Sequence, residues 1–95
     1  MRLTLEFMDA DRGVRLRTDG DVPGATMVSA HRAFARDHLD RFASCRYWYS
    51  DHSRVTGLQW STAHAAEVAF ICETLARVNP ELVVANLAPA ISRSG

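Results

Sequence analysis

The sequence predicts an α/β domain with the element order ββαβαβ, in which a mixed four-stranded sheet packs against two helices. Apolar and polar residues alternate with a period of two near the N-terminus, which indicates strands. Two later segments place apolar residues at helical spacing. The second of these is followed by an apolar run at 82–88 that is typical of a buried strand.

The N-terminal residues predict a hairpin. Residues 2–7 and 14–19 alternate between two faces, so each segment has one face suited to a core. The connection from Asp9 to Gly13 is short, and Gly13 is expected to take positive φ. Residues 20–24 are expected to end the hairpin, because Pro23 cannot donate a hydrogen bond to a strand ladder.

A first helix is predicted from Ala25 to about His38. At 100° per residue one apolar stripe forms, while Arg32, Arg36 and Asp40 lie off it and face water. The residues of the stripe are Met27, Ala30, His31, Phe34 and His38.

The third strand and second helix follow. The strand is expected to begin near Arg46 with an aromatic segment, and a polar loop is expected to start at Asp51. Ser61 or Thr62 supplies the helix cap, and Asn79-Pro80 ends the helix, because a residue before proline is disfavoured in the α region. The apolar stripe of this helix comprises His64, Val68, Ile71, Leu75 and Val78.

The last strand, 82–88, is predicted to be parallel and covered on both faces, with Pro89 stopping it and 91–95 forming a loose tail. Two strand-helix-strand connections require parallel neighbours in the sheet. Since 95 residues bury a limited core, a homodimer is expected.

Composition excludes several classes of protein. Eleven acidic residues balance eleven basic ones without a basic cluster, so nucleic acid is not an expected partner. No apolar run reaches the ~20 residues of a membrane span, and no signal-peptide core is visible. Two widely spaced cysteines, Cys45 and Cys72, fit reduced thiols and a cytoplasmic location.

Residues 51–63 carry a family resemblance. Asp51, Ser53 and Val55 follow an aromatic strand, and Ser61-Thr62 begin a helix a few residues later. This order is similar to the STAS or SpoIIAA-like domains of bacterial anti-sigma factor antagonists, in which Asp-Leu-Ser-x-Val precedes an Asp-Ser-Ser-Gly segment. The resemblance covers roughly residues 2–88 and implies one domain over 1–90.

The resemblance implies a non-enzymatic regulatory or protein-interaction module that docks on a kinase or an anti-sigma-like protein. Ser61 occupies the position of the phosphorylated serine, although Trp60 replaces the acidic residue of the family and Ala63 its glycine. The predicted interaction edge comprises Asp51, Ser53, Trp60, Ser61 and Thr62. Phe70 lies off the apolar stripe of its helix, which suits either a protein contact or a satellite core.

Three histidines support an alternative function. His31, His38 and His64 fall on predicted apolar stripes, which is consistent either with partly buried imidazoles or with a small polar pocket. A pocket would make the chain a small-ligand-binding protein or a minor enzyme. His31 and His38 are two helical turns apart, so no metal site is predicted, and no cofactor motif is present. Consecutive residues Asp51-His52-Ser53 are not expected to form a hydrolytic triad.

Overall fold

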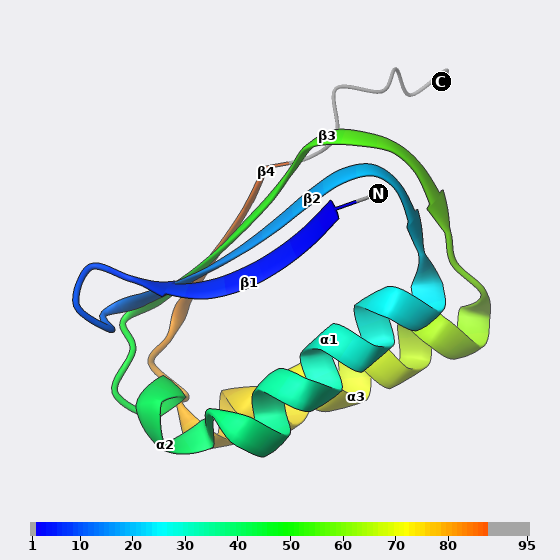
Figure 1. Ribbon diagram of the computed structural model, residues 1–95. Coiled ribbons are helices and arrows are strands. Elements are labelled where there is room, and N and C mark those ends of the chain that lie inside the picture. Colours follow the sequence, from blue (N-terminus) through cyan, green and yellow to red (C-terminus); the bar gives the residue numbers. More distant parts are fainter. Residues whose placement is uncertain (1, 88–95) are drawn as a thin grey trace.

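The computed structural model describes residues 2–87, which form two layers, a curved sheet and a pair of long helices. Both long helices lie on the same side of the sheet (Figure 1). The elements are β1 (Arg2–Met8), β2 (Gly13–Pro23), α1 (Gly24–Asp37), α2 (Leu39–Phe42), β3 (Tyr47–Gln59), α3 (Thr62–Val78) and β4 (Val83–Leu87).

The strands lie side by side in the order β1-β2-β3-β4. The pair β1–β2 is antiparallel, whereas β2–β3 and β3–β4 are parallel. The predicted ββαβαβ order, the mixed four-stranded sheet and the two packed helices are therefore confirmed. The short helix α2 is an addition that the sequence pattern did not indicate.

The β1–β2 turn differs from the prediction. Positive φ falls on Asp9, Ala10 and Asp11, with φ of 53°, 53° and 66°, and not on Gly13. Gly13 is needed for another reason, since a Cβ built there would lie 1.9 Å from Cζ of Tyr47. The Tyr47 ring thus lies across the start of β2, where only glycine leaves room for it.

Both helices present their predicted stripes to the interior. Met27, His31 and Phe34 are buried on α1, and Ile71 and Leu75 are buried on α3. On the opposite side of α1 the predicted exposure of Arg32 and Arg36, and of Asp40 in α2, is observed. The helical period therefore identified the buried faces correctly.

The main core lies between the sheet and α1. Its centre is aromatic: the ring centroids of Phe34 and Trp48 are 5.3 Å apart, and those of Phe34 and Phe42 are 5.8 Å apart, both pairs edge to face. Edge-to-face pairs add to the stabilisation that burial alone provides. The fully buried Val14, Leu16 and Val22 of β2 complete the contact with the sheet.

The polar loop predicted from Asp51 is absent, because β3 continues as a strand to Gln59. The chain accommodates the polar residues with a β-bulge. Arg17 pairs with Asp51 and Asp19 pairs with Arg54, so two residues of β3 oppose Thr18 alone. Asp51 stabilises the bulge by accepting hydrogen bonds from the amide and the hydroxyl of Ser53, at 3.0 and 2.6 Å.

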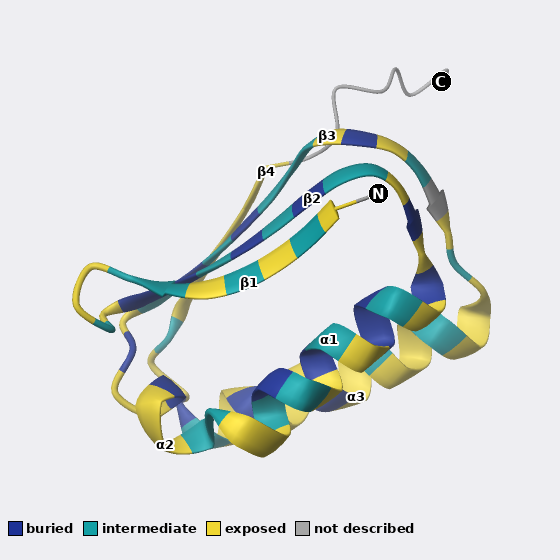
Figure 2. Cartoon of the chain, in the orientation of Figure 1, coloured by how far each residue is buried: buried dark blue, intermediate teal, exposed yellow. Residues whose placement is uncertain are grey.

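The prediction that the last strand is covered on both faces is wrong. Every residue of β4 is exposed, including Val83 at 64% and Val84 at 58% (Figure 2). Since both long helices lie on one side of the sheet, the other face of β4 has no cover among the described residues. Ala88, Pro89 and the predicted tail 91–95 lie outside the described residues.

Within residues 2–87, no helix combines the length and apolar character that crossing a lipid bilayer requires.

Candidate functional site: an apolar cavity beside α3

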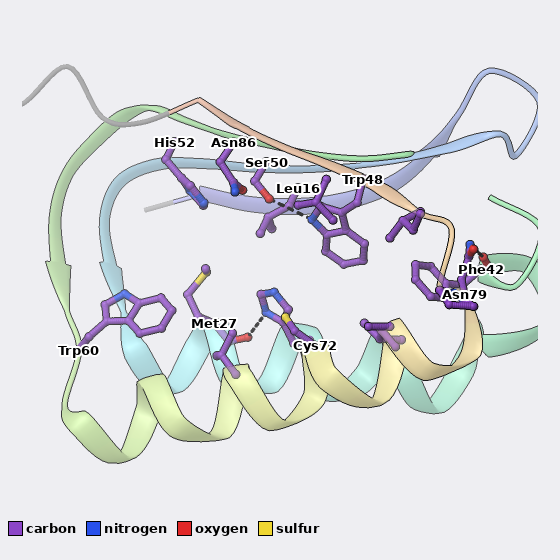
Figure 3. A pocket seen from close by; sticks show the side chains of 17 residues that line it. Leu16, Met27, Phe42, Trp48, Ser50, His52, Trp60, Cys72, Asn79 and Asn86 are labelled. Atoms are coloured by element: carbon purple, nitrogen blue, oxygen red, sulfur yellow. Dashed lines mark hydrogen bonds between the residues drawn. The ribbon is translucent and has the colours of Figure 1, made fainter. Parts of the chain in front are cut away.

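A cavity of about 360 Å³ lies between α3 and the helix-facing side of the sheet (Figure 3). It exists because α3 packs chiefly against α1 and not against the strands. The strand β4 extends the sheet beyond β3, and its Val84 and Asn86 side chains contribute to the wall. The space between the layers is therefore unfilled on the α3 side.

Apolar side chains from the three strands β2, β3 and β4 and from the three helices make most of the wall. One end is closed by Phe42 and Asn79, whose side-chain amide donates to the carbonyl oxygens of Phe42 at 3.0 Å and Cys45 at 2.7 Å. The opposite end is formed by Trp60 (Figure 3). The apolar members of the wall include Leu16, Met27, Val68, Leu75, Leu82 and Val84.

His31 of α1 brings an imidazole to the wall. It is 4% exposed, and its Nδ1 lies 2.8 Å from the carbonyl oxygen of Met27, one turn earlier in the helix. A carbonyl oxygen only accepts hydrogen bonds, so Nδ1 carries the proton. The ring stacks on Trp48, with centroids 5.9 Å apart. Burial lowers the pKa of His31, against a smaller opposing effect of the Met27 carbonyl, so the imidazole is neutral at pH 7.

His52 of β3 faces the same cavity from the sheet (Figure 3). Its Nδ1 lies 2.7 Å from Oγ1 of Thr18, which is almost fully buried on β2. Burial lowers the pKa of His52; the Asp51 carboxylate opposes this effect, and the neighbouring His31 imidazole, which would repel a second positive charge, adds to it. The cavity therefore contains two imidazoles that favour the neutral form.

Further polar groups line the wall. The indole N–H of Trp48 donates to Oγ of Ser50 at 2.9 Å, which leaves the Ser50 hydroxyl proton as a possible donor. The indole nitrogen of Trp60 is buried and has no hydrogen-bond partner among residues 2–87. An unpaired buried N–H is costly, and an acceptor on a bound molecule would satisfy it.

No formally charged side chain belongs to the cavity wall as the described residues form it. The wall contains neither arginine nor aspartate nor glutamate, and the sequence has no lysine. Across residues 2–87, no group of three or more histidine, cysteine or acidic side chains is arranged to hold a metal ion. The site is suited to a neutral molecule held by apolar contact and a few hydrogen bonds.

The predicted histidine pocket contains only one of its three members. His38 packs on the rings of Phe7 and Phe34, at centroid distances of 5.6 Å in both cases, and does not reach the cavity. His64 lies at the start of α3, where a Cβ on Gly24 would come within 2.3 Å of its Nδ1. The grouping of His31 with His38 and His64 is thus wrong, because the three rings contact different surroundings.

His52 was missed by the sequence analysis. A loop starting at Asp51 would carry the His52 side chain away from the sheet, whereas the alternation of Trp48, Ser50 and His52 indicates a continuing strand. Continued at a period of two, that alternation places all three side chains on the helix-facing side of one strand.

Ser61 is the N-cap of α3, as predicted. Its hydroxyl accepts from the amide of His64 at 3.1 Å, and Nδ1 of His64 accepts from the amide of Ser61 at 3.3 Å, which completes a reciprocal capping box. Ser61 and Thr62 are exposed, and Trp60 is partly buried in the cavity wall.

Asp51 and Ser53 lie far from this helix start. They belong to the bulge in β3, and the strand continues to Gln59 before the helix begins. At ~3.3 Å per strand residue, the path from Asp51 to Gln59 is roughly 26 Å. The residues predicted as one docking edge therefore form two separate groups, one in the bulge of β3 and one at the start of α3, and their role in an interaction stays a prediction.

The fold occurs in two solved structures with little sequence similarity to this chain. One is described as "Crystal Structure Analysis of Mglu"; it matches with a TM-score of 0.57 and 14% identity over 93% of this chain and 20% of that one. The other, described as the same protein "in its native form", gives 0.52 and 13% over 88% and 23%. This chain thus spans under a quarter of either structure, and the likeness shows the fold alone. No protein-family model and no curated protein matches the chain.

Proposed function

We propose that the chain is a binding module for a small, mostly apolar molecule held in the cavity between α3 and the sheet. The cavity carries the proposal: about 360 Å³ is within the range of ~300–1,000 Å³ for small-molecule sites. Its wall is apolar apart from a few hydrogen-bonding groups, among them His31, Ser50 and His52. Apolar contact supplies affinity in such a site, and the few polar atoms orient the ligand.

The expected affinity is moderate. A ligand that buries about 200 Å² of apolar surface gains ~5 kcal/mol at ~25 cal/mol per Å², before the cost of immobilising it. Hydrogen bonds to the imidazoles add to this gain. Since the walls are already in place, a dissociation constant on the order of 10–100 μM is expected.

Binding of the neutral fluorescent probe N-phenyl-1-naphthylamine tests the proposal. The probe is expected to gain intensity with the protein and to saturate at one molecule per chain. Cys72 provides a second measurement, because it is an exposed thiol on the cavity wall whereas Cys45 is buried. A molecule in the cavity should slow modification of Cys72 by a thiol reagent.

A matched pair of variants supplies the control. Ala76→Trp adds an indole at the cavity wall and should abolish probe binding, whereas Ala66→Trp adds the same group to α3 away from the wall and should not. Saturable binding that Ala76→Trp leaves intact, or no binding by the wild-type chain, would rule out this site.

A second proposal concerns the edge of the sheet, where we infer that β4 pairs with β4 of a second copy. The sequence of β4, Val-Val-Ala-Asn-Leu, has no charge, and its large side chains are exposed. The other edge, β1, carries Arg2 and Glu6, which discourage strand pairing. An antiparallel β4–β4 pair centred on Ala85 is self-complementary, as a two-fold interface requires.

We also propose that the chain is related to STAS-like interaction modules. The ββαβαβ order and the exposed Ser61 at the start of α3 support this relationship. Incubation with candidate serine kinases and intact-mass measurement tests it; no mass increase on Ser61 would leave Ser61 as a helix cap only.

A further inference from the structure

We propose that the ligand of this cavity is a neutral, mostly apolar molecule with a hydroxyl or N–H group that donates a hydrogen bond to Nε2 of His31. This inference rests on the proposed binding function and specifies the class of ligand.

The acceptor at His31 is set by the local backbone. Its Nδ1 proton is held at 2.8 Å by the Met27 carbonyl oxygen, so Nε2, on the opposite edge of the ring, carries the lone pair. Among residues 2–87, Nε2 has no hydrogen-bond partner. The stack on Trp48 fixes the plane of the ring, so the direction of the lone pair is fixed before a ligand arrives.

The composition of the cavity wall is the reason why the ligand is expected to be uncharged. A carboxylate or an ammonium group would lose its hydration on entering and would meet no opposite charge, because no acidic or arginine side chain is among the lining residues that the structure describes. A hydroxyl or N–H group loses less hydration and regains a hydrogen bond at His31. The cavity should therefore discriminate against both anions and cations.

Aromatic groups suit the wall better than aliphatic ones. Trp48, Phe42 and Trp60 all contribute ring surface to the cavity. Planar rings pack on such surfaces in edge-to-face or offset geometry, which adds to the gain from burial. A small phenol combines the apolar ring with the hydroxyl donor.

Three probes of similar size test the inference: 4-ethylphenol, 4-ethylanisole and 4-ethylbenzoate. The first donates a hydrogen bond, the second has the same oxygen methylated, and the third is anionic at pH 7.5. Affinity is measured for each by protection of the Cys72 thiol and by NMR. We expect 4-ethylphenol to bind about tenfold more tightly than 4-ethylanisole, and 4-ethylbenzoate to bind more weakly than either.

The ¹⁵N shift of His31 Nε2 provides a direct measurement in the wild-type chain. It should move towards the hydrogen-bonded value with 4-ethylphenol and stay unchanged with 4-ethylanisole. His31→Phe keeps a ring for stacking but has no acceptor, so the preference for the phenol should disappear in that variant.

The possible outcomes separate the two proposals. If none of the probes protects Cys72 and N-phenyl-1-naphthylamine does not bind, the binding function itself fails. If 4-ethylanisole binds as tightly as 4-ethylphenol, or the His31 Nε2 signal does not move, the cavity binds apolar molecules but the assigned ligand class is wrong. Tightest binding by 4-ethylbenzoate would also overturn the inference.

Discussion

The hydroxyl of Thr18 and Nδ1 of His52 lie 2.7 Å apart and join β2 to β3 at the first of the two places where these strands lose their regular register. Two residues of β3 oppose Thr18 at this bulge. The hydrogen bond fixes the imidazole, so a feature of strand pairing determines how a cavity side chain is oriented.

Thr18→Val removes that hydrogen bond while keeping the shape of the side chain. We expect unfolding in urea to show a loss of about 1–2 kcal/mol, because a part-buried imidazole nitrogen loses its partner. Thr56→Val is the matched control: Thr56 is an exposed threonine of β3, and its change should stay within ~0.5 kcal/mol. Equal effects of the two substitutions would show that the Thr18 hydrogen bond does not stabilise the fold.

Stability should decrease as the pH falls below about 6.5. Burial lowers the pKa of both His31 and His52, so the unfolded chain binds more protons than the folded one between the folded pKa values and ~6.5. The stabilisation is fully present above pH 6.5 and is lost as the pH falls through that interval. Urea midpoints at pH 7.5, 6.5 and 5.5 measure the loss.

A double variant, His31→Gln with His52→Gln, provides the comparison for the pH series. It removes both imidazoles that share the cavity, so its free energy of unfolding should change less between pH 7.5 and 5.5 than that of the wild-type chain. An equal pH dependence in both proteins would assign the effect to other groups.

The sequence predicted most of the fold but only part of the site. Strand and helix periods located the buried faces of α1 and α3, since Met27 and Ile71 obey a local geometric rule. The bulge at Thr18 is different, because it depends on how two strands distant in sequence pair. The same holds for β4: its apolar residues suited burial, but the absence of a covering helix is a tertiary property.

The cavity could not be predicted for a related reason. Its size depends on α3 packing against α1 and not against the strands. No single residue of the sequence determines that arrangement of the helices. The position of His31 on an apolar stripe correctly indicated that its side chain is buried. His64 also lies on a predicted apolar stripe, but its side chain forms the capping box with Ser61.

The capping box predicts a measurable role for Ser61. Ser61→Ala should destabilise the chain by about 1 kcal/mol, because the His64 amide loses its acceptor. Ser61→Asp should recover most of that loss, since aspartate caps helices well and its charge favours the helix N-terminus. Ser29→Ala, on the exposed side of α1, is the control. Thermal unfolding of the four proteins compares them, and equal stability of Ser61→Ala and wild type would show that the cap does not contribute.

The unpaired edge at β4 yields the last prediction. In an antiparallel β4–β4 pair, Val83 of one copy lies opposite Leu87 of the other, and both are exposed in the single chain, at 64% and 44%. Val83→Lys places a charged side chain against the apolar Leu87 of the other copy at each end of the pair, so the dimer should dissociate. Sedimentation equilibrium should give a dimer for the wild-type chain and a monomer for Val83→Lys. Thr4→Lys, on the exposed side of β1, adds the same charge at the other edge and should leave the dimer intact. A wild-type chain that is monomeric at 100 μM, or a dimer that only Thr4→Lys dissociates, would show that β4 is not the contact.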